Sequence, residues 1–178
     1  MSKPGRMFVF AALVLLAGGP SFAAEPKEPD GQQFLKQSGL EAIHGTYTKY
    51  FTLLADNKSE AAVELLIQSF PKNVDEETRR HMRELSAAIS SVFARGVEDV
   101  ELVGAQSVSS KCVALYYVLN GATGPTLVML TPYRREGTWY THSWSTSIDV
   151  HKIIDSLKGI TRFSGNVVGR PKPPGRRA

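Results

Sequence analysis

The apolar residues of this chain change their spacing near Gly96. Before it they recur every three to four residues, which is typical of one face of a helix, and after it they alternate with polar residues, which is typical of strands. The first pattern predicts helices that begin at residues 32 and 61, and a longest helix that is capped by Asn73 or Asp75. The second predicts strands over 97–108, 111–120, 126–134 and 138–147, before a last short helix over 150–157. Helices followed by an antiparallel meander indicate an α+β fold, in which N-terminal helices pack on a curved antiparallel sheet.

The first 23 residues have the order of a secretory signal peptide. Lys3 and Arg6 form a basic head, residues 7–17 are apolar, and Gly-Gly-Pro then breaks any helix. The small residues that follow predict cleavage after Ala23, with Ala24 as the alternative. The apolar run of 11 residues is short for a membrane span, which needs ~20. The sequence therefore predicts export, to the periplasm of a Gram-negative cell or to the medium.

The rest of the chain divides into a linker over 24–31, a single domain over 32–157 and a basic tail over 158–178. The tail is rich in proline and glycine, and we expect it to be largely disordered from about residue 170. Residues 24–157 hold 13 basic and 17 acidic side chains, a net charge of −4, so the basic character lies at the chain ends. This distribution argues against nucleic-acid binding by the domain.

A resemblance to a known superfamily is carried by the order of the elements and by Glu136-Gly137-Thr138-Trp139. Residues 32–157 resemble the nuclear transport factor 2-like superfamily, many small members of which have an acidic-Gly-x-Trp hairpin. The resemblance implies a cone, in which a bent sheet wraps around a long helix and leaves a pocket at its wide end. It implies no single activity, because the superfamily includes dehydratases, isomerases, secretion-system subunits and domains without an assigned reaction.

The last predicted strand carries the strongest candidates for a ligand pocket. Strict alternation places Tyr140, His142, Trp144 and Thr146 on one face, opposite a face of Trp139, Thr141, Ser143 and Ser145. With Tyr47 and Tyr117, the residues Tyr140, His142 and Trp144 form the predicted pocket. His142 is the weak candidate for a catalytic proton carrier, because its pKa lies near working pH. Its possible partners, left open by the sequence, are His44, Asp149 and the tyrosines Tyr47, Tyr116 and Tyr117.

The sequence gives little support for disulfide, metal or cofactor chemistry. Cys112 stands alone, which excludes a disulfide framework and a multi-cysteine zinc site. The four histidines lack the spacing of a metal signature, and no glycine-rich phosphate loop precedes a helix, so no metal and no cofactor is expected.

Three functional hypotheses follow from these features. The leading one is an exported binding or accessory domain without catalytic activity, which takes a small apolar ligand or a protein partner and forms a homodimer through its open sheet face. The second is a pocket enzyme of the isomerase or lyase type that uses His142. The third is an envelope protein whose basic tail docks on an anionic surface, where so few charges would hold a membrane only weakly.

Overall fold

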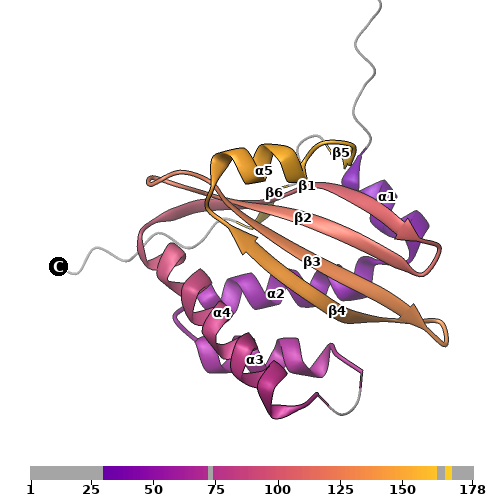
Figure 1. Ribbon diagram of the computed structural model, residues 1–178, viewed down its shortest axis with the longest axis horizontal. Helices are drawn as coiled ribbons and strands as arrows, with labels where there is room; N and C mark the ends of the chain where they lie inside the picture. Colours follow the sequence, from indigo (N-terminus) through magenta and orange to yellow (C-terminus); the bar gives the residue numbers. More distant parts are fainter. Residues whose placement is uncertain (1–29, 72–73, 164–166, 170–178) are drawn as a thin grey trace, which may run out of the picture.

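The computed structural model describes residues 30–71, 74–163 and 167–169, which form five helices and a curved antiparallel sheet (Figure 1). The signal peptide, both cleavage residues Ala23 and Ala24, and the tail beyond residue 169 lie outside the described residues. The helices are α1 (Gly31–Ser38), α2 (Glu41–Ala55), α3 (Ser59–Gln68), α4 (Glu76–Ala94) and α5 (Val150–Ser156). The strands are β1 (Val97–Ser109), β2 (Cys112–Gly121), β3 (Thr126–Arg135), β4 (Thr138–Ser147), β5 (Thr161–Arg162) and β6 (Val167–Gly169). The predicted α+β fold, with helices before the meander, is confirmed.

Local sequence signals explain where the helices begin and end. The carboxylates of Asp30, Asp75 and Asp149 accept backbone N–H groups at the first turns of α1, α4 and α5. The single helix expected from residue 32 is instead two helices. Gly39 adopts a left-handed φ of 65° and donates its N–H to the Lys36 carbonyl, which ends α1 before α2 starts.

The sheet has the order β4-β3-β2-β1-β5, and β6 also pairs with β1. Each neighbouring pair is antiparallel, as expected for hairpin connections. The turn between β3 and β4 is the two-residue loop Glu136-Gly137, in which both residues have positive φ. A shift of register between Leu102 and Gly104 confirms the irregularity that the sequence predicted near Gly104.

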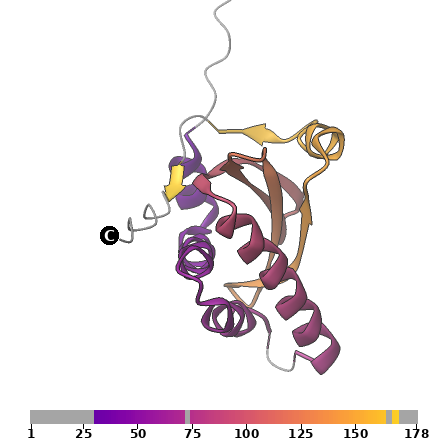
Figure 2. The same ribbon diagram turned by 90° about the vertical axis from the view of Figure 1, so that its left-hand side faces the viewer.

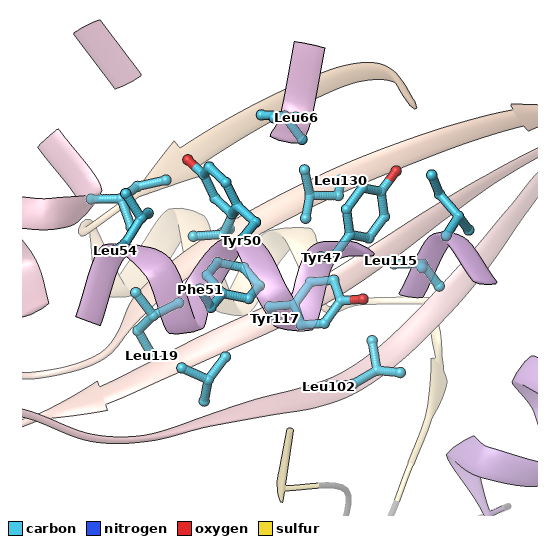
Figure 3. Close-up of a cluster of buried hydrophobic side chains, with 14 of the residues drawn as sticks. Tyr47, Tyr50, Phe51, Leu54, Leu66, Leu102, Leu115, Tyr117, Leu119 and Leu130 are labelled. Atoms are coloured by element: carbon cyan, nitrogen blue, oxygen red, sulfur yellow. The ribbon is translucent and has the colours of Figure 1, made fainter. Parts of the chain in front are cut away.

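The main core lies between the helices and one face of the sheet. Figure 2 shows α2, α3 and α4 on this side of the sheet and α5 on the other. Apolar positions of α2, spaced three and four residues apart, meet alternate residues of β2 and β3, as Figure 3 shows. The fully buried members with the largest side chains include Tyr47, Tyr50, Tyr117, Leu54, Leu66, Leu115 and Leu119.

A smaller core covers part of the opposite sheet face. There Ile153 of α5 packs with Ala114, Tyr116, Val118 and Leu127. Both faces of β2 are therefore buried, which explains its almost continuous apolar sequence. The sheet face on which a homodimer was predicted is thus occupied, in this region, by α5.

The folded unit extends beyond the boundary predicted at residue 157. β5 and β6 both pair with the outer edge of β1, and the buried ring of Phe163 packs against Phe34 of α1 at 5.2 Å between centroids. β5 and β6 therefore belong to the sheet and shield the β1 edge, which would otherwise expose unpaired backbone groups.

Gly104 lies where the chain entering β5 approaches β1 closely. A Cβ at this position would lie 2.5 Å from Cδ1 of Ile160 and 2.6 Å from the Thr161 carbonyl oxygen. We expect Gly104→Ala to lower the free energy of unfolding by about 1–3 kcal/mol, because the β5 backbone has to move. Thermal melting measures the loss, and trypsin should cut faster after Arg162 as β5 loosens.

Gly45→Ala is the matched control for this substitution. Gly45 is exposed on α2, and a Cβ built there meets nothing within 4 Å. Alanine inside a helix is favoured over glycine by up to about 1 kcal/mol, so the control should melt no lower than the native protein. Equal melting temperatures for both variants would contradict the close approach at Gly104.

Candidate functional site

A β-bulge in β4 decides which of its side chains face the helices. β4 pairs with β3 in regular register from Thr138 to Thr141, but Thr131 lies opposite Ser143 and Pro132 opposite Thr141, so His142 is an extra residue. Trp139, Thr141 and Trp144 all face the helix layer as a result: the two indoles pack on the main core, and Thr141 is fully buried. The alternation predicted for this strand is therefore wrong beyond Thr141, because it assumed no inserted residue.

A surface hollow of about 370 Å³ lies where the first half of α4 passes β4. We call it the α4–β4 groove. Its lining residues are Phe70, Glu77, Thr78, His81, His142, Ser143 and Trp144. Two of the predicted pocket residues, His142 and Trp144, thus meet in one hollow.

The aromatic wall of this groove is built around Trp144. The Phe70 ring stands edge-on to the indole, with 5.3 Å between centroids and 88° between planes. The His81 imidazole lies on α4 at 5.7 Å from the same indole. The α3–α4 connection, α4 and β4 therefore place a phenyl, an imidazole and an indole side by side.

The indole N–H of Trp144 is buried and has no hydrogen-bond acceptor among the described residues. Most buried polar groups in proteins are paired, so an unpaired donor calls for an explanation. Leaving such a donor unsatisfied costs about 1–3 kcal/mol. The donor has no contact with solvent, so an acceptor from outside the chain reaches it only when the side chains around the indole move.

His142 does not have the surroundings of a proton carrier. Its side chain is exposed, its closest aromatic neighbour is Tyr133 at 6.2 Å between centroids, and no described side chain hydrogen-bonds to it. A general base must lie within ~3 Å of the proton that it abstracts, or be joined to it by one water, and no described side chain orients this imidazole for that task.

Each predicted partner of His142 is engaged elsewhere or buried away from it. His44 hydrogen-bonds to the Tyr117 hydroxyl at 2.8 Å, Asp149 caps α5, and Tyr116 donates to Gln106. The catalytic pair imagined for His142 is therefore not assembled in the described part of the chain.

Tyr47 and Tyr117 lie inside the core and not on a surface hollow. Both are fully buried, and their rings meet edge to face at 6.2 Å between centroids. Burial raises the pKa of both hydroxyls above 10, so both stay protonated at neutral pH. Burial also lowers the pKa of His44, which favours its neutral form.

Tyr140 belongs to a second hollow, of about 390 Å³, between α2 and the β3–β4 hairpin. The five predicted pocket residues thus divide into the groove pair His142 and Trp144, the core pair Tyr47 and Tyr117, and Tyr140 in this separate hollow. The cone pocket that the resemblance implied would have brought them together.

A chain of hydrogen-bonded hydroxyls, buried at Tyr47 and Thr141 and part-buried at Ser69, attaches β4 to the helices beside the groove. The Tyr47 hydroxyl lies 3.0 Å from Oγ1 of Thr141, which lies 2.6 Å from Oγ of Ser69. The Thr141 backbone N–H also donates to the Ser69 carbonyl at 2.7 Å. The end of α3 therefore caps the free edge of β4 at its middle and fixes the position of Phe70, the next residue.

Sequence reasoning missed Phe70, Thr78 and His81 as groove residues. Nothing in the local spacing signals that they meet Trp144, because the contact depends on how α4 crosses the sheet.

Two general tests of the described residues complete the site. No helix in this part of the chain is both long and apolar enough to cross a membrane. No group of three or more histidine, cysteine, aspartate or glutamate side chains within the described ranges is arranged to hold a metal ion.

Comparison with known proteins gives no match, either to a protein-family model or to a curated protein. The superfamily resemblance therefore stays a prediction.

Proposed function

We propose that this protein is an exported, non-catalytic binding domain that holds a small ring-bearing ligand in the α4–β4 groove. One observation carries the proposal: Trp144 lines the groove, and its buried indole N–H lacks an acceptor among the described residues. A ligand that displaces the side chains covering the indole can offer a carbonyl or ring nitrogen to this N–H and recover about 1–3 kcal/mol.

The chemistry of the groove walls supports a ring-bearing ligand. Phe70, His81 and Trp144 offer planar faces and edges on which another ring can stack. Thr78 and Ser143 add hydroxyl groups, and the exposed carboxylate of Glu77 stands at the rim. Apolar and aromatic walls with a few polar groups are typical of sites for small molecules.

Export is the other half of the proposal. It rests on the basic head, the apolar run and the small residues before Ala23 and Ala24. Cell fractionation tests it directly: the chain should appear outside the cytoplasm, shortened by its first 23 or 24 residues. Recovery of the full-length chain from the cytoplasm would contradict it.

The indole N–H resonances provide a direct test of the groove. The chain contains two tryptophans, so Trp139→Phe and Trp144→Phe assign both signals. We expect benzamide, which combines a ring with a carbonyl, to shift the Trp144 signal saturably while the Trp139 signal stays in place. Trp144→Phe keeps a ring but removes the donor, so benzamide should bind it about tenfold more weakly.

Cyclohexanecarboxamide is the control ligand, because it keeps the carbonyl and lacks the aromatic ring. It should shift the Trp144 signal only at much higher concentration. The proposal fails if neither benzamide nor the small-molecule fraction that co-purifies with the protein moves the Trp144 signal. It also fails if both indole signals move alike, which indicates non-specific contact.

A further inference from the structure

An apolar patch lies exposed where β4 passes into α5. Five large hydrophobic side chains are exposed among the described residues, and three of them fall within seven positions. Ile148, Val150 and Ile154 are 71%, 50% and 53% exposed. We call these three residues the α5 patch. Scattered exposed apolar residues are common on protein surfaces, but a concentration of this kind is typical of contact surfaces.

The charges around the α5 patch balance. Asp149 and Asp155 are negative, Lys152 and Lys158 are positive, and Lys158 pairs with Asp155 at 2.7 Å. A surface with charges of both signs can face a copy of itself without net repulsion. A partner of strong net charge would find little net electrostatic attraction to it. An anionic membrane would prefer a basic rim without the two aspartates.

The strand that leads into the patch is also suited to self-pairing. β4 is an edge strand of the sheet and carries no lysine, arginine, aspartate, glutamate or proline. Free edges of natural sheets are usually guarded by such residues. Within the described ranges, no backbone hydrogen bond from outside the sheet reaches β4 beyond Thr141. In a two-fold pairing, a charged residue near the axis would meet its own copy, so a neutral edge fits a second copy of the chain.

We propose that the α5 patch and the end of β4 from Ser145 onward form a docking surface for a second copy of this protein. The two patches meet about a two-fold axis, and the two β4 ends lie side by side. The contact begins beyond Trp144, so it leaves the α4–β4 groove open and stands independently of the proposed ligand. Three exposed side chains and a short strand end make a small interface, so the dimer should be weak and depend on concentration.

Sedimentation velocity on the purified chain tests the proposal. We expect the sedimentation coefficient of the native protein to rise from a monomer value to a dimer value as concentration increases. Ile154→Glu places two like charges against each other in the dimer, so it should weaken association more than about tenfold. Because Ile154 is exposed, the variant should melt like the native monomer.

Val108→Glu is the matched control. Val108 is 64% exposed on the β1–β2 hairpin, and the change adds the same charge away from the patch. It should associate like the native protein. The proposal is overturned if the native protein stays monomeric at all concentrations, if Ile154→Glu still dimerises, or if both variants lose the dimer equally. Co-sedimentation of a monomeric native protein with phosphatidylglycerol vesicles, lost in Ile154→Glu, would also overturn it and assign the patch to a lipid surface.

Discussion

Tyr117→Ala is expected to lower the free energy of unfolding by about 3–5 kcal/mol, the range for truncating a large aromatic residue in a core. Tyr117 is fully buried at the centre of the sheet and contacts rings from α2 on two sides. The Phe51 ring lies 5.2 Å away and the Tyr47 ring 6.2 Å away between centroids. Removing the Tyr117 ring leaves a cavity between helix and sheet that neither element can close alone. Denaturant unfolding followed by circular dichroism measures the loss.

Tyr117→Phe separates packing from hydrogen bonding at the same position. This variant keeps the ring and removes only the hydroxyl, which lies 2.8 Å from Nδ1 of His44. His44 is half-buried and can turn toward water, so we expect a loss of only about 1 kcal/mol. If the phenylalanine variant lost as much as the alanine variant, the hydrogen bond and not the ring would hold this part of the core.

Periodicity was sufficient to predict most of the fold. The change of spacing at Gly96 placed the end of the helices and the start of β1 correctly, because Gly96 directly precedes the first strand. In the first helical segment, apolar residues at three- and four-residue spacing include Ile43, Tyr47 and Tyr50, and all three are buried. These features depend on local residue spacing, which a single sequence displays directly.

The candidate site was harder to predict, because one inserted residue reverses the faces of a strand. His142 is inserted in β4, so Trp144 points to the helices together with Thr141 and not with His142. A signal was present in the sequence: Pro132 cannot donate to a ladder hydrogen bond, and it lies opposite the bulge. It did not show which residue of the partner strand is inserted.

Contacts between distant segments were beyond the reach of sequence patterns. Phe70 follows α3, His81 lies on α4, and the rings of both lie beside Trp144. A backbone hydrogen bond from Thr141 to Ser69 fastens the start of the α3–α4 connection to the β4 edge. The same fastening divides the expected pocket, since it places Tyr140 and Trp144 in separate hollows on either side of Thr141.

Thr141→Val is expected to lower the free energy of unfolding by about 2–4 kcal/mol, since it leaves a buried tyrosine hydroxyl without a partner and removes a second hydrogen bond. Thr141 is fully buried and joins the Tyr47 hydroxyl at 3.0 Å to the Ser69 hydroxyl at 2.6 Å. Valine has nearly the same shape, so the loss reports the hydroxyl and not a cavity. Because Ser69 precedes Phe70, the Trp144 indole resonance should also shift as the groove wall loosens.

The double variant Tyr47→Phe with Thr141→Val distinguishes an unsatisfied hydroxyl from lost packing. Removing both partners is much less costly than removing one, because no buried donor is then left unpaired. We therefore expect the double variant to be more stable than Thr141→Val alone, by about 1 kcal/mol or more. If the losses of the two single variants simply add, the Tyr47 hydroxyl does not depend on Thr141. The hydroxyl chain would then not be what holds β4 and the α4–β4 groove against the helices.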